Sequence, residues 1–252
     1  MVYRCLICLL LFIPAVGSSQ SDYTAASAAA AMAADEPMQA AAIADSLEAT
    51  GVLSPELYLL QGNAYFAAGR TGRAVLAYER GLRLQPGNQD LQNNLAFVRE
   101  QSRIEDAAVG QFALVAFWNR AGAALGTTLA YSLCLLFWWI AVAGALWWYL
   151  RRAGMDERKR FALLPTATLC AVVALLFFAL GRSRSAYLSR TDEGILLEAA
   201  TLRVAPTAGG SVEAQLPEGV RLYITDRVDR YVKIQLADGR SGYLEAERVG
   251  VI

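Results

Sequence analysis

The sequence predicts a multidomain membrane protein with an all-α array, a two-helix transmembrane hairpin and a small all-β barrel. Three observations support this prediction. Two charge-free runs lie in the middle of the chain, at 121–150 and 161–181. Helical periodicity dominates the residues before these runs, and short alternating strands with glycine-containing turns dominate the residues after them. The pattern therefore indicates two soluble domains joined by a membrane anchor.

Each charge-free run is long enough to cross a bilayer. A hydrocarbon core of about 30 Å needs about 20 helical residues, since each residue rises about 1.5 Å. The first run exceeds that length, so we expect a juxtamembrane segment at 107–126 and transmembrane helices at 127–150 and 161–181. Trp118 and Trp147 fit the two interfaces as an aromatic belt would.

The charges predict the orientation of the hairpin. The loop at 151–160 carries five basic residues against two acidic ones, and dense basic loops stay in the cytoplasm. The N-terminus agrees, because residues 1–19 combine Arg4, an apolar core and small residues suited to cleavage, as in a signal peptide. An uncleaved anchor is the alternative for this segment. Both soluble domains are therefore expected on the outer side of the membrane.

The composition argues against several classes of function. The formal net charge is zero, so the basic excess needed for nucleic-acid binding is missing. The chain has no histidine, and its four cysteines, Cys5, Cys8, Cys134 and Cys170, all lie in apolar segments. Neither a disulfide framework nor a zinc site is then available in a soluble domain. No nucleophile elbow or phosphate-binding loop is present, so we expect no enzyme, no metal and no cofactor.

The stretch 57–86 carries a recognisable helical-pair pattern and resembles the tetratricopeptide repeat. Gly62 would let the first helix approach its partner closely, and Gly81 costs roughly 1 kcal/mol of helix propensity where alanine is usual. Gln61 stands where the repeat usually has leucine. The residues that match the repeat signature are Tyr58, Gly62, Tyr65, Ala74, Tyr78 and Pro86.

One repeat cannot bury its own faces, and about three are normally needed. The flanking residues 23–50 indicate a degenerate helical pair, and 89–104 indicates one closing helix. The predicted repeat domain therefore covers 22–106. Its surface would hold an extended peptide or a partner helix; the alternative is a spacer of packed helices that binds nothing.

The last part of the chain, 182–252, is predicted to form about five short strands in a small barrel. The first strand is expected at 196–204, and Asp238-Gly239 predicts a hairpin turn. The strings 202–207, 216–219 and 237–244 resemble a bacterial SH3-like (SH3b) domain. Such domains often bind peptides or cell-wall fragments through aromatic side chains. The candidates for that ligand face are Tyr223, Tyr231 and Tyr243, although Tyr231 and Tyr243 could instead complete the core.

Taken together, the signal peptide, the repeat array, the hairpin and the SH3-like domain resemble BatE proteins of the Bacteroides aerotolerance (Bat) cluster. The resemblance implies a bacterial inner membrane protein with both soluble domains in the periplasm. It implies von Willebrand type A-domain membrane proteins as partners, with an indirect link to a MoxR-type ATPase. The expected function is a non-enzymatic, membrane-anchored scaffold that uses the tetratricopeptide and SH3-like modules for protein–protein interaction in an aerotolerance or oxidative-stress envelope complex. The alternative is a peptidoglycan sensor or anchor that binds through the SH3-like domain.

Overall fold

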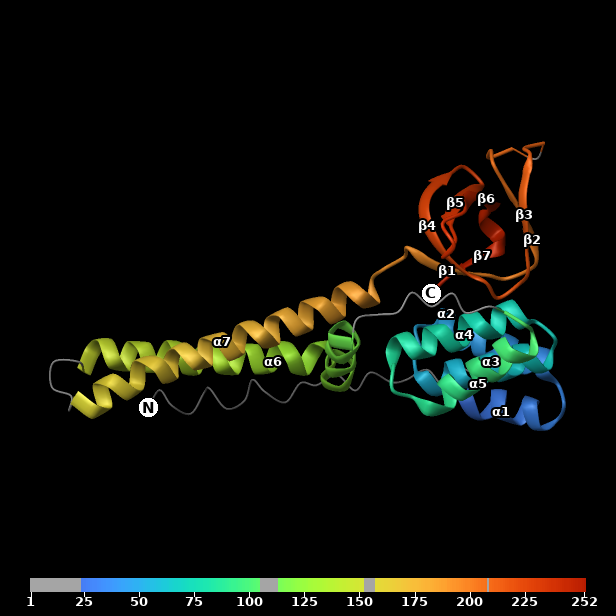
Figure 1. Ribbon diagram of the computed structural model, residues 1–252. Coiled ribbons are helices and arrows are strands. Elements are labelled where there is room, and N and C mark those ends of the chain that lie inside the picture. The colour runs from blue at the N-terminus through green and yellow to red at the C-terminus, as the bar shows by residue number, and fades with distance from the viewer. Residues whose placement is uncertain (1–23, 105–112, 152–156, 208) are drawn as a thin grey trace, which may run out of the picture.

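A computed structural model describes residues 24–104, 113–151, 157–207 and 209–252. The predicted signal peptide at 1–19 lies outside these residues, as do the start of the juxtamembrane segment and the middle of the loop at 151–160. The described residues form a helical domain, a long helical hairpin and an antiparallel sheet (Figure 1).

Five helices build the described part of the N-terminal domain: α1 (Ala25–Ala33), α2 (Pro37–Ala49), α3 (Pro55–Ala67), α4 (Thr71–Leu84) and α5 (Gln89–Gln101). Local sequence sets where they begin. The side-chain oxygens of Thr24, Ser54 and Asn88 each accept a backbone N–H from the first turn of α1, α3 and α5. Pro37 and Pro55 stand at the starts of α2 and α3, where the missing N–H would have had no partner within the helix.

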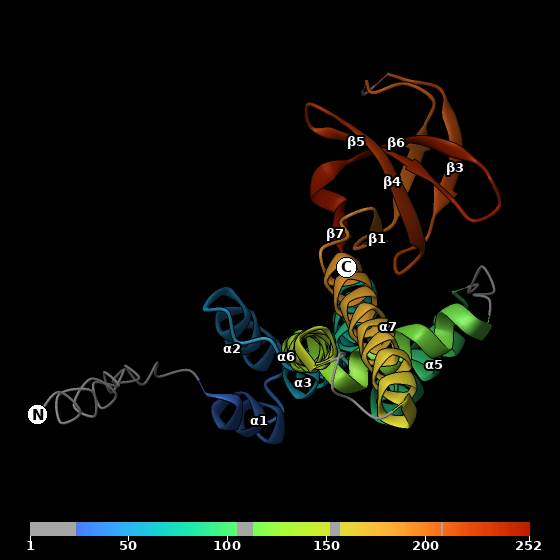
Figure 2. The ribbon, with the colours of Figure 1, turned by 90° about the vertical axis from the view of Figure 1, so that its left-hand side faces the viewer.

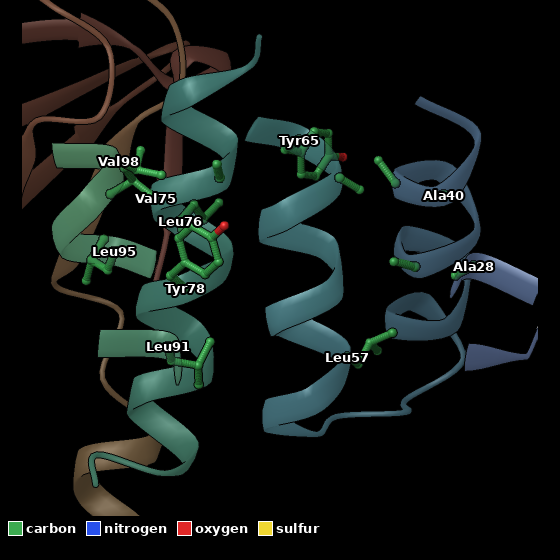
Figure 3. Close-up of a cluster of buried hydrophobic side chains, with 14 of the residues drawn as sticks. Ala28, Ala40, Leu57, Tyr65, Val75, Leu76, Tyr78, Leu91, Leu95 and Val98 are labelled. Atoms are coloured by element: carbon green, nitrogen blue, oxygen red, sulfur yellow. The ribbon is translucent and has the colours of Figure 1, made fainter. Parts of the chain in front are cut away.

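The helices form two layers. Helix α3 contacts both α1 and α5, and these three lie on the side away from the sheet, whereas α4 contacts the sheet (Figure 1). Apolar side chains fill the space between the layers, among them Leu57, Tyr78, Leu91 and Val98 (Figure 3). A single buried cluster therefore runs through the helices, as stacked repeats require.

Two glycines allow the close helix packing of this cluster. A Cβ atom on Gly62 would overlap the ring of Tyr78, so α3 and α4 could not approach as they do with any larger residue. A Cβ atom on Gly81 would lie 2.8 Å from Leu91 Cδ1. Gly81 therefore lowers the helix propensity of α4, but it allows α5 to pack closely against α4.

The hairpin consists of α6 (Ala113–Arg151) and α7 (Glu157–Leu188), which lie side by side and project away from the other domains (Figure 1). Both contain stretches long and apolar enough to cross a membrane, at Phe117–Leu150 and Pro165–Leu188. Small side chains meet at the helix contact, including the buried Ala130 and Ala174. Large apolar side chains such as Trp139 point outward, as lipid contact would require.

The C-terminal residues form a seven-stranded antiparallel sheet with the strand order β3-β2-β6-β5-β4-β1-β7. Its strands are β1 (Glu193–Leu196), β2 (Ala200–Arg203), β3 (Val212–Leu216), β4 (Arg221–Val228), β5 (Tyr231–Gln235), β6 (Ser241–Glu245) and β7 (Val249–Val251). The single strand expected at 196–204 is in fact two strands. They part because β1 pairs with β4 and β7, whereas β2 pairs with β3 and β6.

The sheet packs directly on α4. Ile195 and Ile252 join the same apolar cluster as Val75 and Leu76 of α4. A Cβ atom on Gly72 would overlap the backbone carbonyl groups of β1 and the residue after it, so α4 lies against the strand backbone itself. The core of the helical domain therefore extends into the edge of the β domain, which also has an apolar cluster of its own.

Arginines complete this junction and connect it to the hairpin. Arg83 of α4 donates to the carbonyl of Tyr187 at 2.7 Å, in the last turn of α7, and also to the carbonyl of Ile252. Arg184 of α7 donates to the carbonyl of Leu84 at 2.6 Å, the last residue of α4. The final carbonyl groups of a helix lack partners within it, so each arginine caps the helix that carries the other.

A buried carboxylate adds an ionic contact between the domains. Glu79 of α4 pairs with Arg99 of α5 at 2.5 Å and with Arg221 of β4. Arg221 also pairs with Glu193 of β1 at 3.4 Å. Because Glu79 is almost fully buried, loss of both arginines would leave an uncompensated charge inside the junction.

The substitution Gly72→Leu should separate the β domain from α4. Leucine has the higher helix propensity, so α4 itself should gain stability, while the added side chain collides with the β1 backbone. Overpacking of this kind costs roughly 1–3 kcal/mol. Differential scanning calorimetry of the detergent-solubilised chain should show a lower melting temperature and loss of a shared transition for the two domains. Gly87→Leu is the control, since a Cβ there meets nothing within 4 Å. Equal melting temperatures and equal transitions for the two variants would contradict the packing of β1 on α4.

The substitution Arg83→Met should destabilise the junction while keeping the apolar stem of the side chain. The free energy of unfolding, measured by urea denaturation of the full chain, should fall by about 1–3 kcal/mol for each buried carbonyl that loses its donor. Arg70→Met provides the comparison, because Arg70 also reaches the β domain but only through an exposed pair with Glu198 at 4.0 Å. If Arg83→Met lowers the free energy of unfolding no more than Arg70→Met does, the hydrogen bonds from Arg83 to these carbonyl groups contribute nothing to stability.

Candidate interaction surfaces

The layer of α1, α3 and α5 forms a surface that the β domain does not cover, which we call the open face. Its most exposed large apolar side chain is Phe97 of α5, which is 57% exposed. Phe97 meets Phe66 of α3 edge to face, with 5.8 Å between the ring centroids. An aromatic pair held in this geometry by two helices is a typical anchor for a protein partner.

Two amides lie beside this pair on the same helices. Asn63 Oδ1 of α3 accepts hydrogen bonds from the hydroxyl of Tyr78 at 2.8 Å and from Asn94 Nδ2 of α5 at 3.1 Å. The two bonds fix the orientation of the Asn63 amide, so its Nδ2 group is directed away from Tyr78 as a hydrogen-bond donor. The open face thus combines an aromatic anchor with fixed amides that can bind a peptide backbone.

A partly buried polar cluster lies on the opposite side of α3, toward the β domain. Asp45 of α2 accepts from Tyr65 at 2.5 Å and from Gln61 at 2.7 Å. Glu48 of α2 accepts from Tyr58 at 3.1 Å and from Gln61 at 3.0 Å. Both repeat tyrosines of α3 therefore donate to carboxylates of the preceding repeat, which explains why a glutamine replaces the usual leucine at position 61.

The chemistry of this cluster is that of a structural network. Burial, followed by the neighbouring carboxylates, raises the pKa of Tyr58 and of Tyr65 to about 12, so both phenols stay protonated and keep donating. Arg80 of α4 adds a 2.8 Å contact to Glu48 and donates to the carbonyl of Val251. A cavity of about 210 Å³ adjoins these groups. The hydrogen bonds of this cluster thus link α2 through α4 to the last strand.

The structure places the repeat-signature residues within the helical core and its edges. Tyr58, Gly62, Tyr65, Ala74 and Tyr78 are all buried on α3 and α4, and Pro86 follows the end of α4. Figure 3 shows Tyr65 directed toward α2. It also shows Tyr78 on α4, whose ring lies against Gly62 of α3. None of these residues lies on the open face. They position the helices of that face but form no part of its surface.

The three tyrosines proposed as a ligand face do not come together. Tyr231 and Tyr243 are diagonal neighbours on β5 and β6, since Tyr231 is opposite Glu245 and Lys233 is opposite Tyr243. They line a cavity of about 90 Å³. Tyr231 is only 7% exposed and so belongs largely to the core of the β domain.

Tyr223 lines a different and larger cavity, of about 300 Å³. The walls of that cavity include Pro217 and Leu236 of the β domain and Arg103 at the end of the helical domain. The cavity therefore lies at the junction of the two domains. The ligand face predicted from the sequence is divided between two places.

Several residues that organise these surfaces escape sequence reasoning. Glu79, Arg80 and Arg83 have the spacing of a charged, solvated helix face, and nothing local indicates that a sheet covers them. The one available signal is Gln61, a polar residue at an apolar position of the repeat. A buried glutamine implies buried hydrogen-bond partners, which are Asp45 and Glu48.

Comparison with known proteins supports the helical domain. Residues 55–98 match the family model of the tetratricopeptide repeat. This span covers α3 and α4 and most of α5, which includes both halves of the aromatic pair on the open face. No curated protein and no solved structure gives a significant match to the chain. A tetratricopeptide repeat implies interaction with other proteins.

Proposed function

We propose that this chain is a non-enzymatic, membrane-anchored scaffold that binds a protein partner on its open face. The observation that carries the proposal is the pair of exposed Phe97 and partly buried Phe66 within the residues that match the tetratricopeptide repeat. The fixed Asn63 and Asn94 amides flank the pair and supply polar contacts for a peptide backbone. The β domain packs on the other side of the helices and leaves this surface accessible.

We further propose that the hairpin spans a bacterial inner membrane with both soluble domains in the periplasm. Two apolar helices of sufficient length support the crossing, and the basic residues at 151–160 support a cytoplasmic loop. In this arrangement the protein reaches a cytoplasmic ATPase only through other membrane proteins. Its resemblance to BatE favours von Willebrand type A-domain proteins as these partners, in an envelope complex for aerotolerance.

For the β domain we propose an SH3-like barrel whose main task is to support the helical domain. Its short antiparallel strands and the Asp238-Gly239 turn favour this fold. The competing role, peptidoglycan binding at Tyr231 and Tyr243, has less support, because their cavity of about 90 Å³ is far smaller than the roughly 300–1,000 Å³ of ordinary ligand pockets.

The substitution Phe97→Asp should abolish capture of the partner without unfolding the scaffold. An aromatic anchor typically contributes at least about 2 kcal/mol to an interface, so affinity should fall about 30-fold or more. The measurement is co-purification of the full-length chain in detergent with co-expressed von Willebrand-type membrane proteins. Met38→Asp is the matched control, since Met38 is a similarly exposed apolar residue on α2, outside the open face. Undiminished capture by Phe97→Asp would reject the open face as the binding surface.

Fusion of alkaline phosphatase after Ile252 should give an active enzyme, because the phosphatase folds only after export. The same enzyme inserted after Met155 should be inactive, since that position lies in the proposed cytoplasmic loop. Both activities are measured in whole cells and normalised to the amount of fusion protein. The reverse pattern would overturn the orientation, and equal activity at both positions would overturn the two-span topology.

A further inference from the structure

Helix α6 is interrupted at its outer end. Gly126 has φ 71° and ψ 164°, which is outside the helical region and inaccessible to most other residues. Residues 113–125 therefore form a separate short helix. Figures 1 and 2 show this helix, next to the soluble domains, turned across the axis of the hairpin.

The length of α6 exceeds what a membrane crossing needs. An unbroken helix of its 39 residues would be about 58 Å long, roughly twice the hydrocarbon thickness. The part after Gly126 alone is long enough for a crossing. The residues before Gly126 are therefore free to leave the direction of the span at the surface of the bilayer.

The short helix has two different faces. Phe117, Arg120 and Ala124 share one side at helical spacing and are exposed, with Phe117 65% exposed. The other side carries the buried Gly122, whose Cβ would lie 3.5 Å from Leu180 Cδ1 of α7. One face is thus used by the hairpin, and the other has no partner among the described residues.

We propose that residues 113–125 form an interfacial helix that lies in the plane of the outer leaflet, with Phe117 and Ala124 against lipid. The proposal rests on the membrane-spanning hairpin of the proposed function. Its occupant is the lipid surface itself, because Phe117 begins the same apolar stretch, Phe117–Leu150, that is long enough to cross a membrane. The segment has no acidic residue, and Arg120 on the same face would lie among the lipid phosphates.

This arrangement gives the short helix a mechanical role. Gly122 seats it against α7 close to Arg184, and Arg184 caps the end of α4. A helix held in the membrane plane would therefore fix the tilt of the helical domain, and with it the direction in which the open face points. The partner of the scaffold would then be presented at a defined height above the bilayer.

Depth measurements by electron paramagnetic resonance test the proposal. A cysteine-free full-length chain in phosphatidylcholine–phosphatidylglycerol vesicles would carry one nitroxide at a time, through Phe117→Cys, Ala124→Cys, Leu136→Cys or Asn93→Cys. Collision with oxygen and with a water-soluble nickel complex gives the depth of each label. We expect labels 117 and 124 at the same shallow depth, because an in-plane helix keeps its seven-residue separation parallel to the surface. Label 136 should lie deep, and label 93 should lie in water.

Each other outcome overturns a specific claim. If labels 117 and 124 differ in depth by about 10 Å, the helix follows the membrane normal and the proposal is wrong. If both are as exposed to nickel as label 93 while label 136 is deep, the hairpin spans but the short helix stands off the lipid or packs on protein. A label at 136 that is itself in water would instead overturn the membrane-spanning hairpin on which the proposal depends.

Discussion

Arg83 and Arg184 each satisfy the last carbonyl groups of the helix that carries the other, and the three parts of the molecule meet at this exchange. Arg83 is only 8% exposed and also holds the carbonyl of Ile252, so one guanidinium group connects α4, α7 and the end of the β domain. Both arginines also stack on the ring of Tyr187. A guanidinium is suited to this place because it presents several donors in a fixed plane and remains charged.

The consequence for function is a defined geometry. Because the β domain covers α4 and not the opposite layer, the surface of α1, α3 and α5 stays accessible to a partner. The buried contacts of α4 prevent that layer from turning freely on the hairpin. Two soluble modules that are far apart in the sequence thus behave as one platform, and the short helix at 113–125 would set its height and tilt on the membrane.

The sequence predicted the parts of the molecule better than their assembly. Local signals were sufficient for the repeat helices, since Gly62, Tyr78 and the caps act within one helical pair. The apolar runs similarly located the two long helices. The first strand was wrong, because strand pairing alone separates Glu193–Leu196 from Ala200–Arg203, and pairing partners distant in sequence leave no local trace. The predicted ligand face of Tyr223, Tyr231 and Tyr243 is divided between two cavities for the same reason.

The burial of α4 could not be predicted either. Its arginines and Glu79 have the pattern of a solvated face, and charged residues are rarely buried unless paired. Their partners include a backbone carbonyl group and a side chain more than one hundred positions away, those of Tyr187 and Arg221. Only the tertiary structure brings those partners to α4.

The contacts of α4 hold the helical domain and the β domain together as one rigid body. Pulsed electron paramagnetic resonance tests this arrangement most directly, with nitroxides at the exposed positions Ala42 of α2 and Glu213 of β3 in a cysteine-free full-length chain in lipid nanodiscs. The packing of the β domain on α4 predicts a single narrow distance distribution. A broad or multiply peaked distribution would contradict this arrangement and would mean that the two domains move independently.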